Sequence, residues 1–345
     1  MGIEHVFFCD EKGPRIVPRE NARLSVYDHG VLYGDGVFEG IRIYHNRIFK
    51  FKEHVDRLFA SAEAIELKIP LTKEELSDYI VRVCGENNLT ESGYIRLVVT
   101  RGEGDLGLNP EKCPVPTIFA IAQHIQMYSE GAYKNGLEVL VSKTHRTSAR
   151  SLSPNVKSLN YLNNIMAKIE ATKAGCEEAI MRDMDGRIAE CTGDNFFMVH
   201  NNTIYTPTDR AALKGITRGI VKEICRHEKI EFYETDITLE DLYLKASELF
   251  LTGTAAEIVP VVKVKNTYLP DGARGCLTIG NGKPGPIAKK ILELYRKETL
   301  KPKNGRAIYD VSNMSAMRQS RLPPSFPPED EKQPSLDEKL DTIKV

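Results

Sequence analysis

Short β-rich runs alternate with amphipathic helical patterns over about the first 123 residues, and this alternation restricts the fold more than any other feature of the chain. Residues 53–67 place their apolar side chains on one helical stripe. Thr72 followed by Glu75 has the spacing of a capping box, which predicts the start of a second helix. A chain that alternates strands and helices in this way is expected to form a mixed α/β or α+β fold.

The length of 345 residues is more typical of two domains than of one. A stretch rich in Gly, Ser and Tyr at residues 127–136 predicts a linker between a small N-terminal α/β domain at 1–126 and a larger domain at 137–300. Beyond residue 300, paired prolines and charged residues replace the apolar pattern. Residues 301–345 are therefore expected to be a disordered tail. The alternative, in which its proline-rich run binds a partner protein, is less favoured.

The larger domain should mix hairpins and helices. Two-residue turns at 185–186 and 201–202 predict hairpins, and helices are expected at 159–174, 217–227 and 286–300. Residues 280–285 satisfy the pattern GxGxxG, but they contain a proline and follow no convincing buried strand. We interpret them as a turn and not as a dinucleotide-binding loop.

Composition excludes several classes of protein. A formal net charge of -1 argues against a nucleic-acid-binding protein, which usually carries a basic stripe. The seven cysteines are scattered without a CxxC pair and the histidines show no ligand spacing, so neither disulfides nor a metal site is expected. No run approaches the ~20 apolar residues of a membrane span. We expect a cytoplasmic protein without membrane or nucleic-acid partners.

Two strands present faces suited to a binding site. Residues 34–42 would place Phe38, Gly40 and Arg42 on one face, but taken alone this pattern is better explained by a bulged edge strand. The strand expected at 94–100 places Tyr94 and Arg96 opposite a fully apolar face. The face that carries Tyr94 and Arg96 could line a site.

Three further features could carry chemistry, and each has an ordinary structural explanation when taken alone. Lys157 lies in a loop before a predicted helix, but no property of its surroundings distinguishes it from other lysines. Glu190 on a hairpin strand could simply face solvent. The turns at 214–217 and 252–256 offer backbone N–H groups and threonine hydroxyls that can bind a phosphate, although most such turns bind none.

Taken together and in order, these segments resemble the class IV (fold type IV) aminotransferases over about residues 4–298, and specifically the branched-chain amino acid aminotransferases. The motifs that carry the resemblance are residues 33–42, Lys157 with Tyr161, Glu190 with 193–196, 215–218 and 252–257. The resemblance implies a small N-terminal α/β domain and a larger C-terminal domain that combines a β-barrel-like sheet with helices. It also implies at least a homodimer, in which the neighbouring subunit contributes to the pocket.

The cofactor implied by the resemblance is pyridoxal 5'-phosphate. Lys157 would be the catalytic lysine that forms a Schiff base with it, and Glu190 would pair with its pyridine nitrogen. Tyr161 would hydrogen-bond its phenolic oxygen. The residues implied to hold its phosphate are Arg57, Ile216, Thr217 and Thr254.

The same resemblance implies transfer of the amino group of leucine, isoleucine or valine to 2-oxoglutarate. Tyr94, together with the backbone at Thr254 and Ala255, would bind the substrate carboxylate. Arg96 would receive the side-chain carboxylate of glutamate. The apolar walls of the pocket would come from Tyr33 and Phe38.

Four alternatives stay open on the sequence: D-amino-acid aminotransferases, R-selective amine transaminases, aminodeoxychorismate lyase, and a non-catalytic binding protein of the same fold. Three features favour the branched-chain interpretation. Phe38 is followed by the sequence Glu-Gly-Ile-Arg, and both Tyr94 and Arg96 are present. Arg101 is followed by Gly-Glu-Gly-Asp and not by an Arg-x-His motif that would bind a carboxylate. Retention of Lys157, Glu190 and Arg57 together argues against a non-catalytic protein.

Overall fold

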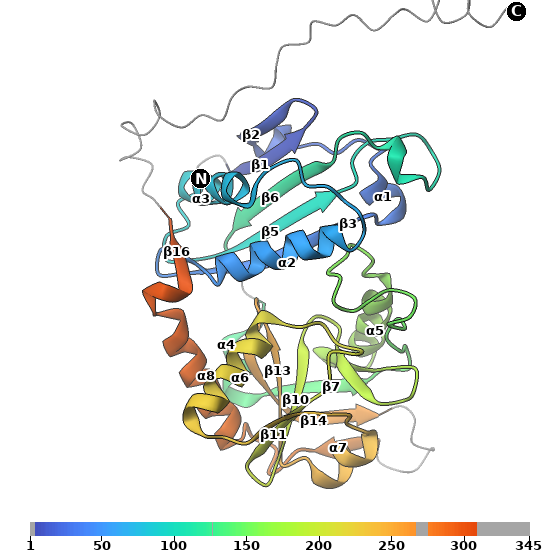
Figure 1. Ribbon diagram of the computed structural model, residues 1–345. Coiled ribbons are helices and arrows are strands. Elements are labelled where there is room, and N and C mark those ends of the chain that lie inside the picture. The colour runs from blue at the N-terminus through green and yellow to red at the C-terminus, as the bar shows by residue number, and fades with distance from the viewer. Residues whose placement is uncertain (1–3, 126, 267–274, 309–345) are drawn as a thin grey trace, which may run out of the picture. The chain divides into compact units, whose positions relative to one another are not determined.

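Two β-sheets organise the computed structural model, which describes residues 4–125, 127–266 and 275–308 (Figure 1). Within these residues the first sheet has seven strands in the order β16-β4-β3-β5-β6-β1-β2, and each neighbouring pair is antiparallel. Its strands are β1 (His5–Asp10), β2 (Gly13–Pro18), β3 (Gly36–Tyr44), β4 (Arg47–Phe49), β5 (Ser92–Thr100), β6 (Thr117–Gln123) and β16 (Gly305–Ala307). The mixed α/β class predicted from the sequence is confirmed.

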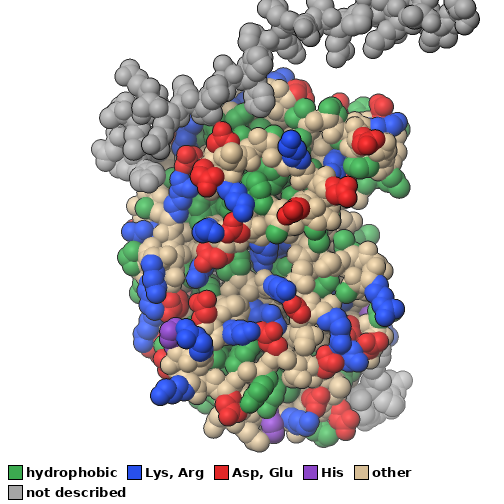
Figure 2. All heavy atoms as spheres, viewed as in Figure 1, with side chains coloured by type: hydrophobic (Ala, Val, Ile, Leu, Met, Phe, Trp, Pro, Cys, Tyr) green, Lys and Arg blue, Asp and Glu red, His purple; other side chains and the backbone are tan. Residues whose placement is uncertain are grey.

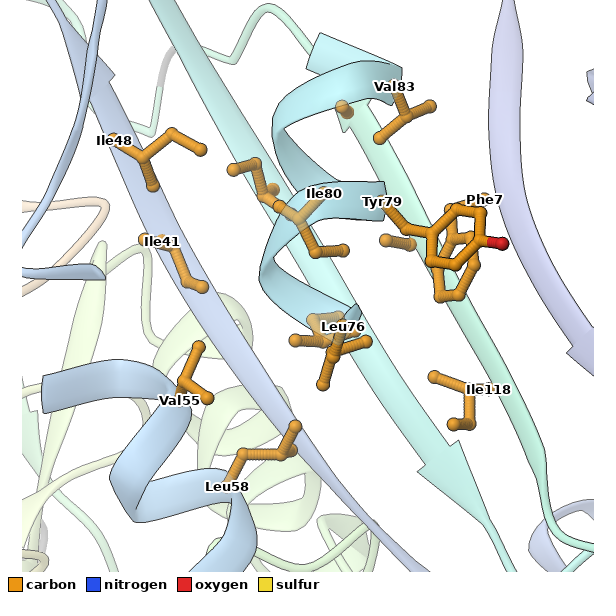
Figure 3. Packing of buried hydrophobic residues seen from close by; sticks show 14 of the residues in the cluster. Phe7, Ile41, Ile48, Val55, Leu58, Leu76, Tyr79, Ile80, Val83 and Ile118 are labelled. Carbon is orange, nitrogen blue, oxygen red and sulfur yellow. The ribbon is translucent and has the colours of Figure 1, made fainter. Parts of the chain in front are cut away.

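Helices α2 (Phe51–Glu63) and α3 (Lys73–Glu86) pack their apolar stripes on this sheet, as Figure 3 shows for Leu58, Leu76 and Ile80. The predicted capping box at Thr72 is present, because its hydroxyl accepts the N–H of Glu75 and the Glu75 carboxylate accepts the N–H of Thr72. Burial of each such leucine or isoleucine stabilises the fold by about 1.5–3 kcal/mol relative to exposure. The buried core of this sheet therefore lies on the face that these two helices cover.

Strands β3 and β5 form the centre of the first sheet. They pair without a register shift from Gly36 opposite Thr100 to Tyr44 opposite Ser92, and β3 lies between β4 and β5. The interpretation of residues 34–42 as a bulged edge strand is therefore wrong. On β5, Ile95, Leu97 and Val99 belong to the buried core, which leaves the opposite face of the strand for other contacts.

The second sheet has nine strands within the described residues, in the order β12-β11-β10-β13-β14-β7-β8-β9, with β15 paired to β14. They are β7 (Leu137–Val141), β8 (Glu178–Arg182), β9 (Ile188–Cys191), β10 (Asn195–His200), β11 (Thr203–Thr206), β12 (Phe232–Glu234), β13 (Glu248–Gly253), β14 (Glu257–Asn266) and β15 (Cys276–Thr278). The predicted turns at 185–186 and 201–202 join β8 to β9 and β10 to β11 as hairpins.

The remaining helices are α1 (His29–Tyr33), α4 (Glu130–Asn135), α5 (Leu162–Lys173), α6 (Ile216–Glu228), α7 (Leu239–Lys245) and α8 (Pro286–Thr299), with 3-10 turns η1 (Arg19–Asn21), η2 (Pro110–Lys112) and η3 (Pro302–Asn304). Helix α5 starts later than the predicted residue 159. The cause is tertiary: Leu159 N–H donates to the Gly36 carbonyl at 2.9 Å and Phe38 N–H donates to the Lys157 carbonyl at 3.0 Å. Residues 157–159 therefore pair with β3 before the helix can begin.

The predicted boundaries of the chain's segments differ from the structure in two places. Residues 127–136 contain helix α4, and residues 301–307 form η3 and then β16, which pairs with β4. The prediction of a disordered tail is thus wrong for 301–307, whereas 309–345, with the proline-rich run, lie outside the described residues. Among the residues that the structure describes, no helix is both long and apolar enough to cross a membrane. All seven cysteines are free thiols.

Candidate active site

A cavity of about 360 Å³ gathers most of the residues that the sequence selected. It is lined by parts of β3, β5, α2, the 157–161 segment, the start of α6 and the end of β13. The predicted site residues among its walls are Phe38, Arg57, Tyr94, Arg96, Lys157, Tyr161, Ile216, Thr217, Thr254 and Ala255. A smaller hollow of about 50 Å³ shares Lys157 and Tyr161 with this cavity and adds Glu190. Segments far apart in the chain thus converge on Lys157.

Lys157 is fixed at one wall of this cavity through its backbone. Its backbone pairs with β3, as described above, and its N–H also donates to the Ser61 hydroxyl of α2 at 3.1 Å. The Nζ atom donates to the Tyr161 hydroxyl at 3.4 Å and lies 4.6 Å from the centroid of the Phe38 ring. A primary amine placed beside a phenol at a cavity wall can act both as a nucleophile and as a proton carrier.

Glu190 on β9 is buried and fully engaged. Its Oε1 lies 2.9 Å from Nη2 of Arg146, and its Oε2 accepts the Leu213 N–H at 2.9 Å and the Asn195 amide at 3.3 Å. Burial raises the pKa of Glu190, although the Arg146 charge and the Leu213 N–H act in the opposite direction. Arg146 itself is fixed by Asn164, which accepts its Nη1 at 2.8 Å. No pattern in the sequence had indicated Arg146.

Arg57 on α2 is oriented by a second buried carboxylate. Its Nε and Nη2 donate to Glu39 at 2.7 and 2.9 Å, and its Nη1 donates to the Lys214 carbonyl at 3.1 Å. Complete burial alone would raise the pKa of Glu39, but the charges of Arg57 and His54 lower it to about 2. Glu39 therefore stays ionised and holds the guanidinium next to the turn that opens α6. No role for Glu39 was predicted.

The two turns suspected of anion binding both lie at the cavity. Gly215 is the N-cap of α6 and makes no side-chain capping bond, so the first N–H groups of this helix are available to a ligand. In the second turn, Thr252, Thr254 and Ala255 line the cavity, and the Thr252 hydroxyl is buried with no partner among the described residues. Both turns thus offer hydrogen-bond donors to an anion.

The β5 wall presents the polar face that the alternation predicted. Tyr94, Arg96 and Val98 all line the cavity. The guanidinium carbon of Arg96 lies 4.6 Å from the centroid of the Phe38 ring and 5.7 Å from that of Tyr94. An arginine stacked between aromatic rings provides a cation inside a largely apolar wall.

Within the described chain, Tyr33 lies outside the lining of this cavity. It ends α1, its ring contacts His29 edge to face at 4.9 Å between centroids, and its hydroxyl accepts the Gly107 N–H at 2.9 Å. Gly34 follows in the left-handed conformation, with φ of 70°, and turns the chain into β3. Tyr33 is therefore not among the residues of this chain that line the cavity, and its role as an apolar wall stays a prediction.

Two curated relatives illustrate what the chain resembles. It is 46% identical over 297 residues to a protein of Methanocaldococcus jannaschii named "Putative branched-chain-amino-acid aminotransferase", and the match covers 86% of this chain and 97% of that protein. It is 34% identical over 266 residues to the D-alanine aminotransferase of Listeria monocytogenes, with 76% of this chain and 90% of the relative covered.

Solved structures of aminotransferases share the fold of this chain. The branched-chain amino acid aminotransferase of Escherichia coli superposes with a TM-score of 0.79 at 31% identity, covering 88% of this chain and 97% of that one. The branched-chain enzyme of Thermobaculum terrenum in its PLP-bound holo-form gives 0.72 at 26% identity, with 86% and 94% covered. Residues 36–264 match the family Amino-transferase class IV. The chain therefore belongs to the class IV aminotransferases, which are pyridoxal-phosphate-dependent enzymes of fold type IV.

Proposed function

We propose that this enzyme transfers the amino group of branched-chain L-amino acids to 2-oxoglutarate, giving branched-chain 2-oxo acids and L-glutamate. The observation that carries this proposal is the pairing of Arg96 with the Phe38 ring inside one cavity. An amino donor with an aliphatic side chain needs an apolar wall, whereas 2-oxoglutarate needs a cation for its second carboxylate. This wall offers both within a few ångströms.

The residues at the cavity fit pyridoxal phosphate by the chemistry of their donors. Arg57, Thr217 and Thr254, together with the N–H of Ile216, would hold the phosphate. Glu190 would pair with the pyridine nitrogen and Tyr161 with the phenolic oxygen. When bound, the cofactor supplies a reactive aldehyde carbon and a ring that accepts the electron pair left by loss of a Cα proton.

Lys157 is the proposed catalytic residue. Its amine would accept the proton from Cα of the amino acid and later deliver a proton to C4′ of the cofactor. The neighbouring Tyr161 hydroxyl would orient Nζ between these two carbon atoms. Tyr94 and the backbone at Thr254 and Ala255 would orient the substrate carboxylate. Glu190, held by Arg146, would stay close to the ring nitrogen and favour its protonated form.

A D-amino-acid aminotransferase is the second candidate, because relatives with that name align over most of this chain. This candidate would be supported if Arg101 were free to bind the carboxylate of a substrate. However, the Arg101 guanidinium already donates to Asp35 at 2.8 Å and to the backbone carbonyls of Ile65 and Glu66 at 2.7 and 2.8 Å. These contacts commit Arg101 to the fold and favour the branched-chain proposal.

The test is steady-state amino transfer to 2-oxoglutarate from L-leucine, L-isoleucine, L-valine, D-alanine and an R-amine. The wild type should use the branched L-amino acids. Lys157→Ala should lose activity by at least about a thousandfold, whereas the matched variant Lys222→Ala, whose side chain is 60% exposed on α6, should be unaffected. Turnover of D-alanine or the amine alone would overturn the substrate assignment but keep the enzyme class.

A homodimer is proposed from an exposed apolar surface. Asn160 Nδ2 donates to the Gly34 carbonyl at 3.0 Å and so joins the end of α1 to the approach to α5. Exposed apolar residues lie on these two elements and on the 106–108 loop: Val31, Leu32, Leu106, Leu108, Leu162, Ile165, Met166 and Ile169. Exposed apolar side chains that gather on neighbouring elements are typical of subunit contacts. A second copy of the chain would cover this surface.

We further propose a cytoplasmic location and small-molecule partners only. The seven free thiols support a reducing compartment. On the face shown in Figure 2, acidic and basic side chains are interspersed, as expected from a net charge of -1. Such a face lacks the basic stripe of a nucleic-acid-binding surface.

A further inference from the structure

The turn between β13 and β14 is anchored through its carbonyl groups. Nη1 of Arg42 donates to the Ala255 carbonyl at 3.3 Å, and the Tyr133 hydroxyl donates to the Ala256 carbonyl at 3.0 Å. In the part of the chain that the structure describes, the N–H groups of Thr254 and Ala255 donate to no backbone carbonyl. The turn therefore has its acceptors occupied and its donors available at the cavity.

Glu257 ends this turn in an unfavourable backbone conformation. Its φ is +59°, in the left-handed region that side chains other than those of Asn and Asp rarely adopt. Glycine would satisfy the backbone better at this position. The presence of a glutamate therefore requires an explanation from the contacts of its side chain.

The carboxylate of Glu257 joins three elements. Its Oε1 accepts the Tyr44 hydroxyl of β3 at 2.9 Å, and its Oε2 accepts Nε of Arg296 from α8 at 3.0 Å. Burial raises the pKa of Tyr44 well above its ordinary value, so this phenol remains a hydrogen-bond donor. The guanidinium carbon of Arg296 also lies 5.4 Å from the centroid of the Tyr133 ring. The same arginine thus supports the residue that anchors Ala256.

The partner of Glu257 on β3 belongs to a buried aromatic group. The Tyr44 ring meets the Phe49 ring edge to face at 5.7 Å between centroids, and Phe49 meets the fully buried Tyr295 in the same way at 5.9 Å. Ile216, the first residue of α6, packs against the hydrophobic cluster that contains these three rings. The partner of Glu257 and the turn that opens α6 therefore adjoin the same buried cluster.

We propose that Glu257 is a positioning residue that locks the 252–256 turn against β3 and α8, and that it thereby sets the affinity of the site for the cofactor phosphate and the substrate carboxylate. The inference rests on the proposed roles of Thr254 and Ala255. Glu257 touches neither ligand in this assignment. The strained backbone is retained because only a carboxylate at this position reaches Tyr44 and Arg296 together.

Three variants separate the carboxylate from the backbone. Glu257→Gly relieves the left-handed strain and removes the carboxylate. Glu257→Gln keeps an acceptor for Tyr44 but loses the ion pair with Arg296, and Tyr44→Phe removes one hydroxyl only. The control is Glu293→Gln, because Glu293 is an exposed carboxylate of α8 paired with Lys297.

The readouts are the dissociation constant of pyridoxal phosphate from visible absorbance of the full-length protein, KM and kcat for the amino acid, and the thermal midpoint without cofactor. Glu257→Gly should weaken cofactor binding by tenfold or more and raise KM more than it lowers kcat. Glu257→Gln and Tyr44→Phe should show smaller changes in the same direction. The control should match the wild type.

A purely structural role would give a different pattern. A lowered thermal midpoint with cofactor affinity and KM within twofold of wild type in all three variants would overturn the proposal. The wild type is measured in parallel. If the wild type fails to bind pyridoxal phosphate, the assignment of Thr254 and Ala255 to ligand binding is refuted together with the role of Glu257. Normal wild-type binding with unchanged variants would refute the role of Glu257 alone.

Discussion

A Cβ atom on Gly40 would lie 2.0 Å from the hydroxyl oxygen of Tyr94, so these two residues fit together only while position 40 has no side chain. The two strands are paired directly at this level, with Gly40 opposite Arg96 on β5. Because position 40 of β3 has no side chain, the Tyr94 ring can occupy the space beside it at the cavity.

Gly40→Ala should displace Tyr94 and lower kcat/KM about 100-fold, because a misplacement of about 1 Å at a binding group has effects of that size. The measurement is steady-state kinetics with L-leucine. Gly219→Ala is a matched control, since nothing lies within 4 Å of a Cβ added at this exposed position of α6. It should retain activity and stabilise the protein by about 1 kcal/mol. Unchanged kcat/KM in Gly40→Ala would contradict the fit.

Glu39→Gln should destabilise the protein by about 3 kcal/mol at neutral pH. The pKa of Glu39 is about 2 in the folded chain against an ordinary value of 4.5, because Arg57 and His54 offset the effect of burial. A depressed pKa gives stability that is present above about pH 4.5 and is lost as the pH falls toward about 2. Urea unfolding at pH 7 and pH 3 should therefore show a smaller difference between wild type and variant at the lower pH. The exposed Glu11→Gln serves as the control.

Asp194→Asn should remove a pH dependence of the opposite sign. Burial and the nearby charge of Glu178 raise the pKa of Asp194 from 3.8 to about 7. The protonated side chain is therefore favoured in the folded protein, and its contribution to stability is lost as the pH rises from about 4 through about 7. The stability of the wild type relative to the variant should fall over this range and stay constant above it. Unfolding free energies at pH 5, 6 and 8 test this, and a difference that does not vary with pH would refute it.

Leu162→Asp should shift the protein toward a monomer, because a charge at this position, 70% exposed on α5, would lie within the proposed subunit contact. Leu244→Asp makes the same substitution at a leucine that is 73% exposed on α7 and should leave the assembly unchanged. Sedimentation velocity distinguishes the two outcomes. Identical sedimentation of both variants would argue for a different interface.

Local patterns predicted those parts of the fold whose cause is local. The capping box at Thr72 and Glu75 and the two-residue turn at 201–202 depend on neighbours in the chain, and both occur as expected. The alternation through Tyr94, Arg96 and Val98 specified which face of β5 meets the cavity, because strand geometry alone decides it. The order of the motifs was sufficient to select most of the cavity's walls.

Features that depend on distant contacts could not be predicted. The ion pair of Glu190 with Arg146 forms between a strand and a loop that approach each other only in the folded chain. The start of α5 moved to Leu162 because residues 157–159 form backbone bonds with β3 in preference to a helical turn. β16 has only three residues, too few for an alternation pattern, and its pairing with β4 is decided by the tertiary structure.

The pairing of β16 with β4 affects the order in which the chain can fold during synthesis. Domains usually fold as units from the N-terminus as they leave the ribosome. Here the first sheet receives its last strand only after the whole second sheet has been translated, so β4 stays an open edge until Gly305–Ala307 emerge. The nascent chain must carry this unpaired edge through most of its synthesis, and an edge of that kind can pair with another chain.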